Sequence, residues 1–151
     1  MGQLVEVDSM DIDGYKVPDN LLYHKEHMWA RVEGDLVVIG GTDFMVKLAG
    51  AVKRVVTLEE DDEVEAGKAF GTISTGKWTG KLYSPVSGEI AEVNEDVDAN
   101  PKIINDDPYG KGWLIKVKPS NLQGDLAGLM KANDGAFEPW FKAEIAKHAK
   151  K

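Results

Sequence analysis

Short apolar runs of alternating or continuous pattern fill the first two thirds of the chain and predict β-strands. Residues 29–32 and 36–39 flank Glu33-Gly34-Asp35, which is the pattern of a β-hairpin with a glycine-containing turn. The pair Gly40-Gly41 is expected to break the second of these strands. The valine-rich run 51–58 predicts a further strand. The pattern therefore favours a mainly β fold.

Helical signals are short and stand between or after these strands. Thr42 can cap a helix over residues 43–49 that ends at Gly50. A helical turn is expected at 101–105, followed by a strand at 113–118. Ser120 or Asn121 can cap a helix that runs to about Met130. The expected buried face of the first helix is Phe44, Met45 and Leu48, and that of the later one is Leu122, Leu126 and Leu129.

A last helix is predicted at 138–149, where Trp140, Phe141 and Ile145 form an apolar stripe. This helix either packs back on the body or docks a partner. Residues 1–16 are then an N-terminal lead-in, 17–130 the main domain, and 131–151 a C-terminal helical extension.

A weak internal repeat suggests two similar halves. Residues 50–55 resemble residues 88–93, and each segment is followed by an acidic turn and a Val-x-Ala unit, at Val64 and at Val97. Lys77 lies near the middle of this pattern. The pattern suits two short sheets that face each other with a turn at one end, and chance similarity between short strands is the alternative.

The composition of the chain limits the classes of function that it can have. The 151 residues suffice for one domain with a sizeable core, and the 42% hydrophobic content is ordinary. The chain has no cysteine and a net charge of −8, which disfavours a thiolate site and a nucleic acid partner. No segment looks like a leader or a membrane span, so we expect a cytoplasmic protein with no membrane partner. Acidic runs at 59–65 and 89–98 indicate either solvated loops or steering of basic partners.

Lys77 is the candidate functional residue. It lies between Gly76 and Gly80 in a turn that joins two β-rich runs, which places one primary amine at a hairpin tip. An exposed amine there is not buried enough to become a Schiff-base catalyst. It suits recognition by a modifying ligase, and acylation would remove its charge and leave a long arm. The turn residues expected to meet a ligase and client enzymes are Ser74, Thr75, Gly76 and Trp78.

Three segments resemble the glycine cleavage system H protein family. They are residues 82–94 (LYSPVSGEIAEVN), 105–114 (NDDPYGKGWL) and 23–29 (YHKEHMW). The resemblance covers about residues 17–130 and puts the lipoyl-bearing lysine of the family on Lys77. It implies a flattened β-sandwich, a barrel-sandwich hybrid of the lipoyl-domain type, with short flanking helices and a C-terminal helix. It also implies a non-catalytic carrier whose lipoate is amide-linked to Lys77.

The chain departs from the family pattern near the lysine. Ser74 and Trp78 stand where the family has an acidic residue and an alanine, and Met28 replaces the acidic residue of a His-Glu-Trp motif. These departures favour a related branch, the lipoate-binding proteins of heterodisulfide-reductase-like sulfur oxidation. The alternative is the H protein of glycine cleavage, which carries an aminomethyl group. The implied partners are a lipoate ligase or lipoyl transferase, the client enzymes of either pathway, and a reoxidant of the dihydrolipoamide dehydrogenase type.

Other classes fit less well. A biotin carrier usually has methionine on both sides of its lysine, where this chain has Gly76 and Trp78. A metal enzyme could be imagined from His24 and His27, but no third ligand clusters with them, so no metal site is expected. An H-protein-like interaction module that lost lipoylation is the second alternative.

Overall fold

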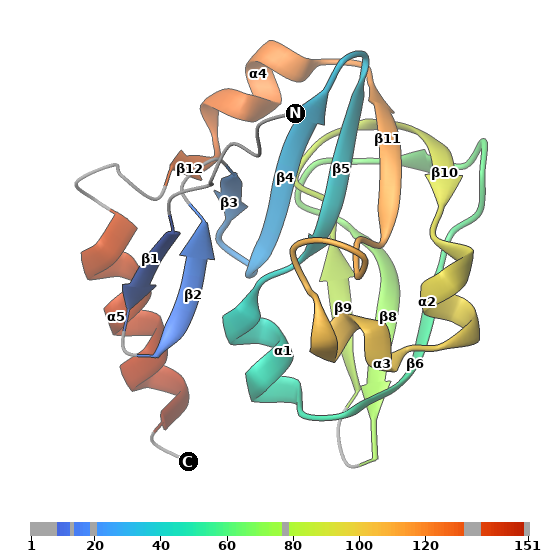
Figure 1. Ribbon diagram of the computed structural model, residues 1–151. Coiled ribbons are helices and arrows are strands. Elements are labelled where there is room, and N and C mark those ends of the chain that lie inside the picture. The colour runs from blue at the N-terminus through green and yellow to red at the C-terminus, as the bar shows by residue number, and fades with distance from the viewer. Residues whose placement is uncertain (1–8, 13, 19–20, 77–78, 132–136, 150–151) are drawn as a thin grey trace, which may run out of the picture.

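The computed structural model describes residues 9–12, 14–18, 21–76, 79–131 and 137–149. The described chain folds into antiparallel sheets with short helices at their margins (Figure 1). The largest sheet has the strand order β12-β3-β4-β5-β11-β10-β7, a three-stranded sheet has the order β6-β8-β9, and β1 pairs with β2. Neither larger sheet closes on itself. The expected mainly β fold with short helices and a C-terminal helix is confirmed.

The elements follow one another in a regular order along the chain. The strands are β1 (Ser9–Ile12), β2 (Tyr15–Pro18), β3 (Leu22–His24), β4 (Met28–Glu33), β5 (Leu36–Gly41), β6 (Val52–Thr57), β7 (Glu63–Val64), β8 (Ala69–Thr75), β9 (Thr79–Tyr83), β10 (Gly88–Val93), β11 (Ile115–Pro119) and β12 (Met130–Lys131). The helices are α1 (Asp43–Ala49), α2 (Glu95–Ala99), α3 (Lys102–Asp106), α4 (Leu122–Ala127) and α5 (Phe137–Ala149).

The main core lies between the seven-stranded and the three-stranded sheets. Side chains alternate along a strand, so Met28 and Ala30 of β4 point into this core, where Ile73 of β8 and Leu82 of β9 meet them. All four side chains are fully buried. The two sheets therefore hold the β8–β9 hairpin against a rigid platform.

A second, aromatic cluster covers the other face of β3, β4 and β5. The ring of Tyr23 lies 5.1 Å from that of Phe137, and Phe44 lies 5.4 Å from Phe141, measured between centroids. Phe137 and Phe141 belong to α5, so the last helix packs on the body, as one of the two interpretations predicted. The hairpin β1–β2, which the sequence pattern did not predict, packs beside it through Tyr15.

Gly40 and Gly41 do not break their strand, so that prediction is wrong. The strand β5 continues to Gly41, and Gly40 pairs with Trp29 of β4. A Cβ atom at Gly40 would lie 2.6 Å from the buried indole of Trp29. The glycine is therefore needed for the ring to lie against the backbone, and it does not act as a strand terminator.

Helix α1 forms as predicted between the Thr42 cap and Gly50. The Thr42 hydroxyl accepts a hydrogen bond from the Met45 amide, and Gly50 has a positive φ of 89°. Its buried residues are Phe44, Met45, Val46 and Ala49. Leu48, expected in the core, is 43% exposed. The short helix turns Val46 and Ala49 inward instead.

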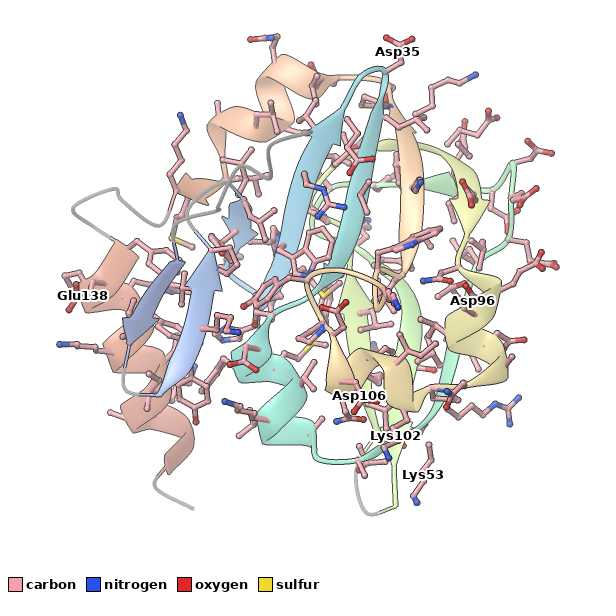
Figure 2. All side chains as sticks on the ribbon, viewed as in Figure 1. Asp35, Lys53, Asp96, Lys102, Asp106 and Glu138 are labelled. Atoms are coloured by element: carbon pink, nitrogen blue, oxygen red, sulfur yellow. The ribbon has the colours of Figure 1, made fainter. Side chains whose placement is uncertain are left out.

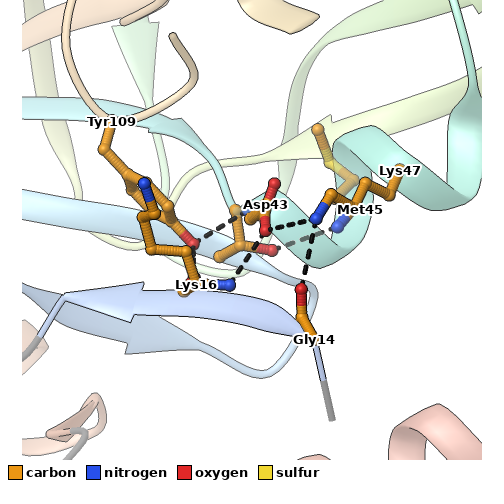
Figure 3. A network of polar contacts seen from close by, with 7 residues as sticks. Gly14, Lys16, Asp43, Met45, Lys47 and Tyr109 are labelled. Carbon is orange, nitrogen blue, oxygen red and sulfur yellow. Dashed lines mark hydrogen bonds and ion pairs between the residues drawn. The ribbon is translucent and has the colours of Figure 1, made fainter. Parts of the chain in front are cut away.

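A polar network ties the start of α1 to the β1–β2 hairpin and to the loop after α3 (Figure 3). The hydroxyl of Tyr109 accepts from the Asp43 amide at 2.8 Å and donates to the Lys16 carbonyl at 2.7 Å. The Asp43 carboxylate accepts from the Lys16 amide at 2.9 Å and lies 3.2 Å from the Lys47 ammonium. Burial is the main cause that raises the pKa of Tyr109, so its hydroxyl stays protonated.

Two element boundaries near the end of the domain differ from the expectation. Helix α4 ends at Ala127, three residues before the predicted end at Met130. Gly128 caps the helix, and Met130 of β12 pairs with Tyr23 of β3. The strand expected at 113–118 is β11, which begins two residues later. Neither difference involves a strand of the three-stranded sheet.

The two histidines have structural partners. His27 Nε2 lies 2.9 Å from Glu144 Oε1 of α5, and its ring stacks on Trp140. His24 Nδ1 accepts from the Glu26 amide at 3.2 Å. No group of three His, Cys, Asp or Glu side chains within the described ranges could hold a metal ion.

Stability is expected to fall as the pH drops below about 6.5, the ordinary value for histidine. Burial, the largest cause, lowers the pKa of His24 in the folded protein, so the unfolded chain binds a proton first. The free energy of unfolding is then unaffected by His24 above pH 6.5 and decreases as the pH falls through the folded-state pKa.

Urea unfolding at pH 7.5 and 5.5 measures this loss of stability. His24→Asn, whose side-chain oxygen can still accept from the Glu26 amide, should show a smaller loss; an equal loss would contradict the assignment.

Candidate functional site

The candidate site is the turn between β8 and β9. These strands pair in antiparallel register through Ile73 with Gly80 and Ser74 with Thr79. The Thr79 hydroxyl lies 3.4 Å from the Ser74 hydroxyl across the pair. The β-rich runs on either side of the lysine in the sequence are thus paired strands, as the pattern of residues 71–88 indicated. Lys77 and Trp78 themselves lie outside the described residues.

Strand β6 supports the hairpin from its other side. Val52 pairs with Thr75, and Arg54 pairs with Ser74. The start of β6 is fastened to α3 by Asn105, whose side-chain oxygen accepts from the Val52 amide at 2.9 Å. The Asn105 amide group also donates to the Gly50 carbonyl at 2.8 Å. The β8 strand of the hairpin is therefore held by β6, while β9 is the edge strand of the sheet.

The residues that lead into the turn are accessible to solvent. Ser74 and Thr75 are half-buried and Gly76 is exposed. A Cβ atom at Gly76 would meet no described residue within 4 Å. The described end of β8 is therefore uncrowded.

The acidic run after β6 lies away from the turn. Thr57 pairs with Gly71 at the other end of the sheet, and the run continues from there to Glu63, which pairs with Glu89. Glu59, Glu60, Glu95 and Asp98 line an open groove of about 640 Å³ between β6 and α2, and Arg54 of β6 lines the same groove. This placement supports the solvated-loop interpretation and not the steering of basic partners to the lysine.

Sequence reasoning missed the residues that shape the site from neighbouring elements. Asn105 was noted only as part of a motif, and its bonds to β6 are tertiary contacts that no local pattern reveals. The sequence pattern also did not predict that Arg54 and Lys81 share the outward face of the hairpin sheet. The signal that could have found these two is the lack of acidic residues at 44–58 and 66–88.

No helix among the described residues is long and apolar enough to cross a membrane. Two facing antiparallel sheets, with a lysine in the segment that joins the paired strands β8 and β9, are the arrangement of a carrier domain of the lipoyl type.

The comparisons with known proteins give the family. The family model described as Glycine cleavage H-protein matches residues 21–138. A glycine cleavage system H protein of Carboxydothermus hydrogenoformans is 43% identical over 78% of this chain and 90% of its own length. A probable glycine cleavage system H protein 2 of Sulfurisphaera tokodaii is 44% identical over 74% of this chain and 78% of its own. The chain belongs to the glycine cleavage H-protein family.

A solved structure agrees with this assignment. The crystal structure of a glycine cleavage system H protein from Mycobacterium marinum superposes with a TM-score of 0.73 at 29% identity, covering 85% of this chain and 99% of that one. Proteins of this family carry a covalently attached lipoate and catalyse no reaction alone. This protein is therefore a lipoyl carrier and not an enzyme.

Proposed function

We propose that Lys77 is the lipoyl attachment site and that Ser74, Thr75, Gly76 and Trp78 form the turn that a lipoate ligase and client enzymes recognise. The observation that carries the proposal is the paired hairpin β8–β9, which brackets Lys77 between Ser74 and Thr79 at an open end of the sheet. Attached lipoate supplies a dithiolane that can carry a group and be reduced to a dithiol. The protein supplies a rigid support that keeps the arm at high local concentration near its partners.

The client pathway that we propose is glycine cleavage, with an aminomethyl group as cargo. The relatives named above are glycine cleavage system H proteins, and the family model carries the same name. None of the relatives named above supports the sulfur-oxidation interpretation that the departures at Ser74 and Trp78 favoured. The partners are then a lipoate ligase, the enzymes of glycine cleavage and a dihydrolipoamide dehydrogenase-type reoxidant, in the cytoplasm.

Sulfur carriage stays the second candidate because Ser74 and Trp78 depart from the family pattern in the turn that a client would meet. Met28, which replaces an acidic residue of the family motif, is fully buried in the main core. A client does not contact this position, so the departure at Met28 does not distinguish the two pathways.

Coexpression with a lipoate ligase tests the attachment site. We expect one lipoyl group, located on Lys77 by peptide mass spectrometry. Modification at another lysine, or at none with ligases from several pathways, would refute the proposal and favour the unlipoylated interaction module.

Transfer assays with the loaded protein test the pathway. Aminomethyl transfer from a glycine decarboxylase supports glycine cleavage. Failure of that transfer, together with oxidation of a sulfur substrate by a heterodisulfide-reductase-like client, would favour sulfur carriage over glycine cleavage. The proposed attachment of lipoate to Lys77 would not be affected by this result.

A further inference from the structure

The outward face of the sheet β6-β8-β9 is an uncovered surface beside the candidate turn. Val55 and Ile73 point into the main core, so the rows on either side of them point outward. The row next to the turn is Arg54, Ser74 and Thr79, and the following row is Val56, Thr72 and Lys81. Arg54, Val56, Thr79 and Lys81 are exposed. Cations and hydroxyl groups therefore dominate this face.

The charge of this face is opposite to that of the whole chain. The net charge is −8, yet no Asp or Glu occurs at 44–58 or at 66–88, which supply all three strands. The ion pairs found within the described ranges include neither Arg54 nor Lys81. Much of the acid lies in the loop after β6 and in α2, whose Glu95 and Asp98 line one groove together with Arg54. Arg54 and Lys81 thus give the face beside the turn a positive charge, and the acidic groove borders this face at Arg54.

Two further cations extend this face around the end of the hairpin. Figure 2 shows Lys53 and Lys102 at the end of the molecule where β8 finishes and β9 begins, while Asp35 lies at the opposite end. Both lysines are exposed. Asp106 is the carboxylate labelled near them, and it lies four residues after Lys102 on α3. We refer to Lys53, Arg54, Lys81 and Lys102 as the cationic face.

We propose that the cationic face docks against an acidic rim around the active-site opening of the lipoate ligase that modifies Lys77. This inference rests on the proposed attachment at Lys77. A carried group must enter a partner's site, so the surface around the turn meets the surface around that opening. Acylation removes the charge of Lys77 itself but leaves the four neighbours charged. Complementary charge there would raise the association rate and align the turn with the opening.

The ionic-strength dependence of lipoylation tests the docking. The probe is a lipoate ligase that modifies the parent protein, with kcat/KM measured from about 20 to about 300 mM NaCl, a range that spans strong to weak screening. Arg54→Glu/Lys81→Glu should lower kcat/KM about tenfold at low salt and much less at high salt. Arg54→Gln/Lys81→Gln should give an intermediate loss, which guards against a folding artefact. The matched control, Lys118→Glu/Lys131→Glu, makes the same change in net charge on the seven-stranded sheet and should stay within about twofold.

The outcomes separate the two proposals. An unmodified Lys77 in the parent protein refutes the proposed function, and this inference with it. Modified Lys77 with equal rates in all variants, or an equal loss in the control pair, overturns the docking alone. Retention of the parent on duplex DNA at physiological salt would overturn a protein partner in favour of nucleic acid.

Zero-length carbodiimide coupling of the protein to the ligase gives a readout independent of activity. This chemistry joins amines to carboxylates in direct contact. Links from Lys53, Lys81 or Lys102 to the ligase's Asp or Glu residues are expected. Links that arise only from Lys118 or Lys131 would place the contact on another surface and overturn the inference.

Discussion

Lys77→Arg is expected to abolish lipoylation completely. Arginine keeps the positive charge and much of the length of lysine, but its guanidinium remains protonated and does not serve as an acyl acceptor. The matched control is Lys81→Arg, two residues into β9, where the side chain lies on the outward face of the sheet. Intact-mass measurement after incubation with ligase, lipoate and ATP should show one lipoyl group on the control and none on Lys77→Arg.

A lipoyl group on Lys81 in the Lys77→Arg protein would contradict the assignment. It would mean that the ligase modifies any exposed lysine on this hairpin and does not recognise the residues of the turn. Circular dichroism of both variants should match the parent, since each replaces one long cationic side chain with another.

Trp29→Ala is expected to lower the free energy of unfolding by about 3–5 kcal/mol. The indole is fully buried between Gly40 and the aromatic cluster, and its Nε1 donates to the Pro108 carbonyl at 3.0 Å. Alanine leaves a large void against a glycine that offers no side chain to fill it. Urea denaturation of the two proteins measures the difference.

Trp29→Phe separates packing from hydrogen bonding. Phenylalanine fills most of the site but leaves the Pro108 carbonyl without its donor, a loss of about 1–3 kcal/mol if no water reaches it. A cost for Trp29→Phe equal to that for Trp29→Ala would mean that the hydrogen bond, and not the packing, dominates.

The predictable part of this fold is local in sequence. The β4–β5 hairpin follows from Gly34 between two apolar runs, and α1 follows from Thr42 and Gly50 as its boundaries. The flanks of the Lys77 turn were predicted for the same reason. Leu48 was misplaced because a seven-residue helix allows more than one buried face, and the neighbouring sheet decides between them.

The remaining features depend on contacts between distant segments. Gly40 was taken for a strand breaker because its partner Trp29 becomes visible only in the paired hairpin. Asn105 supports the hairpin end from α3, more than fifty residues after the strand that it holds. The cationic face needs the register of three strands before Arg54 and Lys81 can be placed on one side.

The aromatic cluster has a consequence for the order of folding. Tyr23 packs against Phe137, which the ribosome adds more than a hundred residues later. During synthesis, the outer face of β3 and β4 thus stays uncovered until α5 is made, while the two facing sheets can already assemble. Contacts of such long sequence separation form late and slow the last step of folding. Between these events the nascent chain exposes an apolar face, the kind of surface that chaperones protect from aggregation.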